Sequence, residues 1–257
     1  MFISVDVGGT NTRLASSNGL ETLAFDETIV RRVNTHDYVN DIGFIVDEAL
    51  RLSQGEPIQA VGIGIPGTLN DEGTELLHAE NLQSWMSRPI AADISGKLHC
   101  PVFMDNDAVA MGLGEVFFGE TSGDFDYIIW GTGIGGSTIR HEHDGIKVEK
   151  RIWETSYKDW ELENGGNALN SKFGKPTTEF TTEEWDTVAA MFETNLKKYC
   201  DTYTPKAVVF GGGLAIKHTD LLNKIGSELG LHLTVTKFGE DSGLFGGFGL
   251  IRRGLAA

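Results

Sequence analysis

One stretch near the beginning of the chain decides the fold: FISVDVGGTNT, residues 2–12. Its first half is apolar and β-branched, which predicts a short buried strand. A glycine turn follows at once, where backbone N–H groups can approach a phosphate closely and where Thr10 and Thr12 offer hydroxyl donors. The alternative interpretation of this stretch by itself is a tight hairpin with a polar turn.

Three more turns follow in order, each at or just beyond the end of an apolar run. They are Asp105-Asn106-Asp107-Ala108, the run GTGIGG at residues 131–136, and Gly211-Gly212-Gly213-Leu214. One such turn is weak evidence. Four of them predict a cleft that holds a nucleotide and an acceptor alcohol.

Strands and helices are predicted to alternate along the chain. The expected strands cover residues 1–7, 12–17, 22–28, 58–65, 101–104, 127–130, 137–140, 145–150, 207–210 and 231–236. The expected helices cover residues 36–52 with Thr35 as a cap, 90–98, 108–118, 161–173, 182–199 and 242–255. This alternation favours an α/β fold with mixed sheets. A strand, hairpin, helix and strand recur in both halves, which suggests two related domains facing a cleft.

Composition limits the partners. The chain has 257 residues, 40% hydrophobic and 23% charged, with a net charge of −16. This charge argues against a general nucleic-acid partner, which needs basic residues facing phosphates. A bound phosphate is still possible, because backbone N–H groups and Mg²⁺ can hold a triphosphate in an acidic protein.

Cysteine usage and hydropathy suggest a cytoplasmic protein. Cys100 and Cys200 form no CxxC pair, so neither a zinc cluster nor a disulfide framework is indicated. We expect no membrane partner, because no signal sequence and no run of about 18 apolar residues is present.

Two carboxylates carry the expected chemistry. Asp107 is the candidate general base, because phosphoryl transfer to a hydroxyl needs a carboxylate within hydrogen-bond reach of that hydroxyl. Asn106 can hold a neighbouring sugar hydroxyl. Asp6 is a candidate for holding Mg²⁺ through water. A plain N-cap role is the alternative for the 105–107 turn, and the two roles are compatible.

The later glycine turns have structural alternatives as well. The run at 131–136 lies between two expected strands, which argues against a dinucleotide-binding fingerprint and leaves a phosphate loop or a simple turn. The glycines at 211–213 would bring backbone close to adenine and ribose, or would only connect a strand to a helix.

At this point the chain resembles the ROK family, sugar kinases of the actin-like ATPase superfamily, over essentially its full length. The matching segments are residues 6–10 and 131–136 for two phosphate loops, 64–67 and 81–85 for the sugar side, 106–108 with 114–115 for the catalytic aspartate, and 211–213 for adenosine.

The resemblance implies two actin-like (ribonuclease H-like) domains with mixed sheets around a central cleft. We expect them at residues 1–105, with the helix at 242–257 packing back on this domain, and at residues 106–241. The implied sugar-binding residues are Gly67, Asn81, Asn106, Asp107 and Glu161. The implied nucleotide-binding residues are Asp6, Gly8, Gly9, Thr10, Thr12, Gly131, Thr132, Gly133, Gly135, Gly211, Gly212 and Gly213.

The sequence departs from the family pattern in one segment. The usual Glu-x-Gly-His segment and its zinc-binding cysteine cluster have no counterpart, so we expect no zinc. Glu149 or Glu154 is a loose candidate to replace the missing glutamate, whereas His141 and His143 are expected to be exposed turn residues. A DNA-binding module ahead of the first phosphate strand is not expected, because that strand begins at residue 2.

The resulting expectation is an ATP- and Mg²⁺-dependent hexose kinase, glucokinase-like, which phosphorylates O6 of a hexose such as glucose and forms a homodimer. The alternatives are a non-catalytic sugar sensor of the same fold, and a kinase for an N-acetylhexosamine or for another, non-sugar acceptor. The sequence does not specify the sugar.

Overall fold

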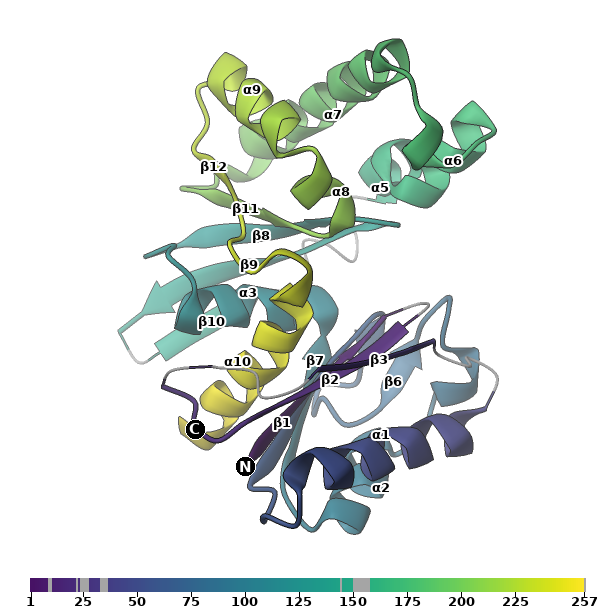
Figure 1. Cartoon of the computed structure of the whole chain (residues 1–257). Helices are drawn as coiled ribbons and strands as arrows, with labels where there is room; N and C mark the ends of the chain where they lie inside the picture. The colour runs from purple at the N-terminus through teal and green to yellow at the C-terminus, as the bar shows by residue number, and fades with distance from the viewer. Residues whose placement is uncertain are drawn as a thin grey trace. The chain divides into compact units, whose positions relative to one another are not determined.

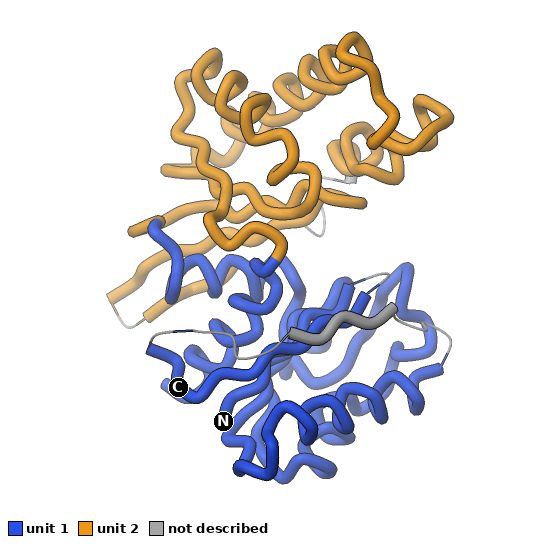
Figure 2. Tube along the Cα trace, viewed as in Figure 1, with its two compact units in different colours: residues 1–120, 241–257 blue, residues 121–240 orange. Residues whose placement is uncertain are grey.

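The protein consists of two compact units. The structure, a computed structural model, describes residues 1–8, 11–21, 23, 28–32, 37–143, 145–149 and 158–256, with only the backbone for residues 28–32 and 158. Unit 1 comprises Met1–Glu120 and Asp241–Ala257, and unit 2 comprises Thr121–Glu240 (Figure 2).

Unit 1 is built on a five-stranded sheet in the order β3-β2-β1-β4-β7 (Figure 1). Its strands are β1 (Phe2–Val7), β2 (Asn11–Ser17), β3 (Thr28–Arg32), β4 (Ala60–Ile65) and β7 (Val102–Asn106). The hairpin strands β2 and β3 are antiparallel, whereas β1, β4 and β7 run parallel. A small separate sheet pairs β5 (Thr68–Leu69) with β6 (Leu76–His78).

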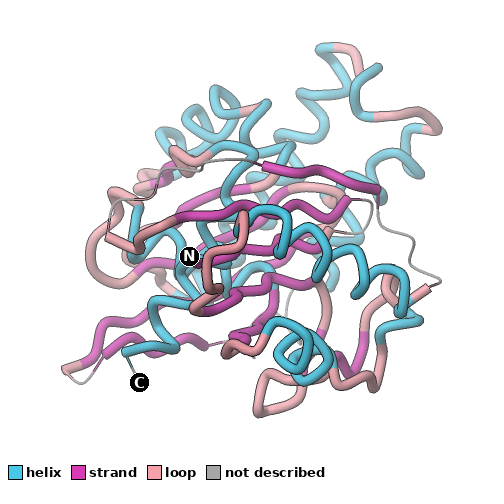
Figure 3. Tube along the Cα trace, turned by 60° about the horizontal axis from the view of Figure 1, so that its bottom comes forward, coloured by secondary structure: helices cyan, strands magenta, loops and turns pink. Residues whose placement is uncertain are grey.

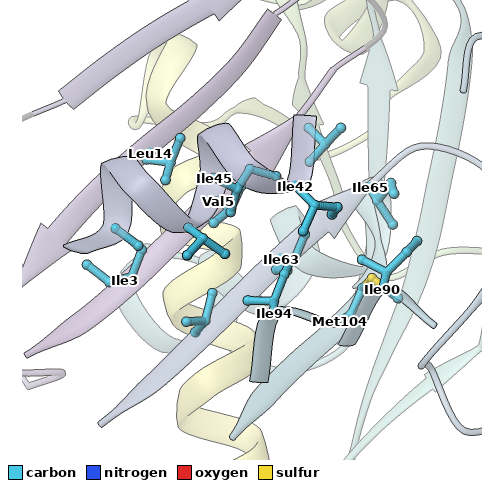
Figure 4. Packing of buried hydrophobic residues seen from close by; sticks show 14 of the residues in the cluster. Ile3, Val5, Leu14, Ile42, Ile45, Ile63, Ile65, Ile90, Ile94 and Met104 are labelled. Carbon is cyan, nitrogen blue, oxygen red and sulfur yellow. The ribbon is translucent and has the colours of Figure 1, made fainter. Parts of the chain in front are cut away.

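Helices cover both faces of this sheet. They are α1 (Tyr38–Ser53), the 3₁₀ turn η1 (Gln83–Trp85), α2 (Ile90–Leu98), α3 (Asp107–Phe118) and α10 (Ser242–Ala256). Apolar residues at helical spacing in α1 face the core, and Asp37 caps this helix by accepting a hydrogen bond from Asn40 N at 3.2 Å. Figure 4 shows Ile42 and Ile45 of α1 packed over Ile3 and Val5 of β1.

The alternation of β1 determines where its carboxylate lies. Ile3, Val5 and Val7 join the core under α1, whereas the residues between them face α10. On that face Ser4 donates a hydrogen bond to Leu244 O at 2.6 Å. Asp6 therefore lies beside the first turn of α10.

Glycines allow α10 to lie directly on the sheet. A Cβ atom on Gly62 of β4 would lie 1.9 Å from Gly247 O, so neither backbone could remain in place with a larger residue. The same helix packs on α3, where a Cβ on Gly246 would lie 2.7 Å from Ala110 C. Through these contacts the last helix of the chain belongs to unit 1.

Unit 2 repeats the same sheet order, β10-β9-β8-β11-β12. The strands are β8 (Phe125–Trp130), β9 (Ile134–Glu142), β10 (Gly145–Glu149), β11 (Val208–Gly211) and β12 (Leu233–Val235). As in unit 1, the first strand pairs antiparallel with a hairpin and parallel with the next strand. Figure 3 shows strands and helices alternating along the chain.

The helices of unit 2 enclose an aromatic core. They are α5 (Lys158–Asn164), α6 (Gly166–Phe173), the 3₁₀ turn η2 (Thr177–Glu179), α7 (Thr182–Tyr203), α8 (Gly213–Lys217) and α9 (Thr219–Leu229), followed by η3 (Gly239–Asp241). Phe192 of α7 lies 4.3 Å from Trp130 and 5.3 Å from Trp160, measured between ring centroids. Both tryptophans are almost completely buried.

Several elements differ from the sequence-based expectation. The strand expected at 22–28 is β3, Thr28–Arg32, and the strand expected to begin at 137 begins at Ile134. The single helix expected over 161–173 is two helices, because Gly165 adopts an extended conformation with φ −62° and ψ 145°. The expected cap Thr35 lies outside the described residues, and Asp37 caps α1.

The division into units also differs from the expected boundary at residue 105. Helix α3 clusters with unit 1, because it packs along α10. None of the helices in the described ranges has the length and apolar character that crossing a bilayer requires.

Candidate active site

The parallel strands β1, β4 and β7 of unit 1 end at one edge of the sheet. Asp6 lies near the end of β1, Gly67 follows β4, and Asn106 ends β7 just before Asp107 begins α3. Ligands of α/β sheets bind beyond the carboxyl ends of parallel strands. The structure thus brings together, at this edge, four residues that the sequence singled out.

Asp6 is an unusual carboxylate for its position. Burial is the main cause that raises its pKa to about 6; the nearby carboxylates of Asp107 and Asp241 act in the same direction, whereas Arg13 acts against it. A Cβ atom on Gly243 would lie 2.2 Å from Asp6 Cγ, so glycine is required where α10 passes this side chain. Asp6 and Asp107 are therefore close enough to interact electrostatically.

The sequence reading missed two charged neighbours of Asp6. Arg13 is directly opposite Asp6 in the β1–β2 ladder, and its guanidinium is paired with the Asp241 carboxylate. The hairpin register could have indicated Arg13, because residues facing each other across a short turn are fixed by the turn. Asp241 could not have been indicated in this way, since it lies 228 residues from Arg13 in sequence.

Asn106 organises the turn that carries Asp107. Its amide donates to Gly67 O at 3.0 Å, and its Oδ1 accepts from Ala108 N at 2.9 Å, which makes it the N-cap of α3. Asp107 Oδ1 also accepts from Ala108 N, at 2.8 Å, and the residue is half-buried. Gly67 has φ +112°, and a Cβ there would lie 2.2 Å from His78 O.

Asn81 lies on an exposed segment of unit 1 that is anchored to α1. The indole N–H of Trp85 donates to Asp41 Oδ2 at 3.3 Å, and Tyr38 contacts the same indole edge-on. Trp85 and Asp41 are both buried. The anchor limits where Asn81 can move.

The first glycine turn is described only in part. Gly8 N donates to Asn11 O at 2.8 Å, whereas Gly9 and Thr10 lie outside the described residues. Thr12 is 4% exposed, within β2.

In unit 2, two glycine turns share the carboxyl edge of the parallel strands β8 and β11. A Cβ on Gly131 would lie 3.9 Å from Gly213 N, so the two turns are adjacent. Gly212 has φ +90°, and a Cβ there would lie 2.6 Å from Trp130 O. A ligand at this edge would meet backbone with very little side-chain cover.

Other predicted residues of unit 2 lie in unexpected surroundings. Gly135 is inside β9, opposite Ile129, rather than in the turn. Glu161 is on α5, and its Oε1 accepts a hydrogen bond from Ile134 N at 3.2 Å. Thr132 is exposed in the turn itself.

The residues offer one plausible magnesium position. Within the described part of the chain the Asp6 carboxylate accepts no hydrogen bond, so its oxygens are available to a cation or to its waters, as Mg²⁺ prefers. No group of three or more His, Cys, Asp or Glu side chains with a metal-binding arrangement is found among the described residues. Glu149 pairs with Lys147 at 3.3 Å, Glu154 lies outside the described residues, and His141 and His143 are exposed.

Comparison with known families settles the relationship of the chain. The ROK family model matches residues 2–144, more than half of the sequence. The chain belongs to the ROK family. The expected membership in this family is thereby confirmed.

Relatives of this ROK protein have several functions. A glucokinase of Thermotoga maritima is 34% identical over 161 residues, which cover 58% of this chain and 49% of that protein. An N-acetyl-D-glucosamine kinase of Salmonella arizonae is 32% identical over 54% of this chain and 46% of its own length. A xylose repressor of Caldicellulosiruptor bescii is 28% identical over 54% of this chain and 36% of its own length. The matched part thus spans about half or less of each of these relatives.

Solved structures agree on the fold. The ROK family glucokinase of Streptomyces griseus, determined with glucose and AMPPNP, has a TM-score of 0.79 at 20% identity over 98% of this chain and 99% of its own. The inorganic polyphosphate/ATP-glucomannokinase of an Arthrobacter species has a TM-score of 0.78 at 21% identity over 100% and 99%. The expected α/β fold of actin-like ATPase type, with mixed sheets, is confirmed.

Proposed function

We propose that this ROK protein is an ATP-dependent sugar kinase that transfers the γ-phosphate to O6 of a hexose such as glucose. The observation that supports it best is the pair of Asp6 and Asp107 at one sheet edge, near enough for Asp107 to raise the pKa of Asp6. The oxygens of Asp6 are available for a cation. Asp107 begins helix α3, directly after Asn106, a candidate sugar contact.

In this proposal Asp107 accepts the proton of the acceptor hydroxyl as its oxygen attacks phosphorus. Asn106 holds a neighbouring hydroxyl. Its hydrogen bond to Gly67 O fixes the position of the turn that carries Asp107 relative to the turn after β4. Asn81 and Glu161 orient the sugar ring, which supplies the positioning part of the rate enhancement.

The glycine turns bind the nucleotide. The proposed residues are Gly8, Gly9, Thr10, Thr12, Gly131, Thr132, Gly133, Gly135, Gly211, Gly212 and Gly213, of which Thr12, Gly135 and Gly211 lie within strands. Asp6 would hold Mg²⁺ through water. When bound, Mg²⁺ would supply positive charge that neutralises the negative charge of the nucleotide phosphates.

The names of the relatives support a sugar kinase, but these names differ in the sugar. Glucokinase and N-acetyl-D-glucosamine kinase are both among them, and so is a repressor. An N-acetylhexosamine or another acceptor is therefore the alternative substrate, and a non-catalytic sugar sensor is the alternative function.

The decisive experiment is an ADP-release assay with Mg-ATP against hexoses and N-acetylhexosamines. Asp107→Asn should lower kcat by about 10²-fold or more with little change in sugar affinity, because the base is lost while the contacts remain. Asp47→Asn, an exposed change on α1, is the matched control. Sugar binding without turnover in the unmodified protein would support the sensor instead.

The proposed homodimer is tested separately, by light scattering of the purified protein at several concentrations. A single monomer mass throughout would remove it from the proposal.

A further inference from the structure

The junction between α5 and α6 holds the glycine turn at residues 131–133. At the beginning of α6, Gly166 N donates to Gly131 O at 2.9 Å and Asn167 N donates to Thr132 O at 2.8 Å. Two successive carbonyl groups of the turn are thus fixed from the same side. Gly131 N donates to Gly133 O at 3.0 Å within the turn. Because the bonds from α6 use carbonyl groups, they leave the N–H groups of Thr132 and Gly133 to other partners.

Glu161 adds a side-chain contact to the same turn. Its Oε1 accepts from Ile134 N at 3.2 Å, directly after the turn. A Cβ on Gly133 would lie 2.2 Å from that oxygen, and the three atoms nearest to it all belong to Glu161. The carboxylate therefore lies against the bare backbone of Gly133, in a space that only glycine leaves open.

We propose that Glu161 is a positioning residue of the second phosphate loop, which fixes the Gly133–Ile134 peptide for the phosphates of a nucleoside triphosphate. The ligand class rests on the proposed function. This role is separate from the sugar contact that family resemblance implies for the same residue, because it concerns the nucleotide and should be measurable when no sugar is present.

The physical reason is the conformational freedom of a glycine-rich turn. Such a turn loses much backbone entropy when it closes on a ligand, and ordering it beforehand reduces that cost. A hydrogen bond from a backbone N–H to an ionised carboxylate is stronger than one to a neutral acceptor. The negative charge gives no direct benefit to a phosphate, so a neutral acceptor of the same shape should serve.

The test is calorimetric titration of the full chain with Mg-AMPPNP in the absence of sugar. We expect Glu161→Ala to weaken binding by about 3- to 10-fold, the size expected for one lost hydrogen bond. Glu161→Gln, which retains the acceptor, should restore binding to within about twofold of the unmodified protein. Glu163→Ala is the matched control, because its carboxylate accepts from Asn195 at 2.7 Å and is not among the contacts of the turn.

A second variant keeps the proposal testable if Glu161→Ala folds poorly. Gly133→Ala should weaken nucleotide binding in the unmodified background, because the new methyl group displaces the carboxylate. Gly133→Ala should weaken nucleotide binding least in the Glu161→Ala background, where no carboxylate remains for the new methyl group to displace. In the Glu161→Gln background the loss of binding should be smaller than the sum of the two single effects only if the carboxamide moves aside. Additive effects of Gly133→Ala and Glu161→Ala would contradict the contact.

The outcomes separate this inference from the proposed function. If Glu161→Ala binds Mg-AMPPNP as well as or better than the unmodified protein and only the KM for sugar rises, Glu161 is a sugar contact alone and the inference is wrong. If nucleotide binding responds as expected but no sugar is phosphorylated, the inference stands and the proposed kinase fails. No nucleotide binding by the unmodified chain would overturn both.

Discussion

Strands β1 and β8 occupy the same place in two sheets of the same strand order, yet the residues near their carboxyl ends differ. The last residue paired with the hairpin is Val7 in β1 and Trp130 in β8. The residue before it is Asp6 in unit 1 and Ile129 in unit 2. The same position of the two sheets thus holds a carboxylate in unit 1 and an apolar side chain in unit 2.

Unit 2 has its own buried carboxylate, and its surroundings show the contrast. Asp126 is completely buried, accepts a hydrogen bond from the Tyr199 hydroxyl, and pairs with Arg140 at 3.2 Å. Asp6 is crowded by α10 but accepts no hydrogen bond within the described residues. The oxygens of Asp126 are therefore used by neighbouring donors, whereas those of Asp6 accept no hydrogen bond from the described residues and are available to a ligand.

The largest stability effect should come from removing the carboxylate of unit 2. Asp126→Ala removes the buried carboxylate to which Arg140 and the Tyr199 hydroxyl donate, so we expect a loss of about 3 kcal/mol in the free energy of unfolding. Urea unfolding followed by tryptophan fluorescence measures it. Asp201→Ala, on the exposed side of α7, should change it by less than about 0.5 kcal/mol.

The same comparison predicts that folded Asp126→Ala protein keeps a kcat near that of the unmodified protein. A kcat loss comparable to that of Asp107→Asn would show that catalytic charge is not confined to unit 1.

In unit 1, removing the charge of a carboxylate should raise the free energy of unfolding rather than lower it. Asp6→Asn should stabilise the ligand-free protein by about 2 kcal/mol at pH 7.5, because burial disfavours the ionised carboxylate, while it removes most activity. Since folding raises the pKa of Asp6 to about 6, the folded state holds the proton more tightly than the unfolded chain. The stability that Asp6 contributes is therefore full at low pH and is lost as the pH rises to about 6.

Thermal unfolding of both proteins from pH 3.5 to pH 8 measures this difference. The gain from Asp6→Asn should grow between about pH 4 and pH 6 and then level off. An equal gain at all pH values would mean that the charge of Asp6 is not the cause.

A smaller effect should distinguish the buried indoles of Trp85 and Trp130. Trp85 in unit 1 donates to the Asp41 side chain at 3.3 Å, whereas Trp130 in unit 2 donates to the backbone carbonyl of Asn164 at 2.8 Å. Asp41→Ala should cost about 1 kcal/mol and raise the KM for sugar about threefold, because the segment carrying Asn81 loses its anchor.

Steady-state kinetics and urea unfolding of Asp41→Ala check this prediction, with Asp47→Ala on the exposed side of α1 as the control. An unchanged KM, together with the expected loss of stability, would mean that Asp41 supports only the fold.

Local patterns predicted much of this molecule. Alternating apolar residues located β1 and β4, and helical periodicity located α2 and α3, because these signals depend on residues only two to four positions apart. The break between α5 and α6 was missed, since glycine at 165 is compatible with a helix and only the packing against the turn at 131–133 favours the extended conformation. The start of β9 was missed because glycines at 135 and 136 resemble a turn.

The sequence by itself determined the two α/β halves, the four turns that follow apolar runs and the membership in the ROK family. Only the tertiary structure decided that Asp241 and Arg13 surround Asp6, that α10 lies on β4 through Gly62, and that Glu161 touches the turn of unit 2. The reason is the separation in sequence of the residues that make each feature. A turn is fixed by its own few residues, whereas contacts between distant residues depend on how whole helices pack, and close packing leaves one arrangement that every neighbour must share.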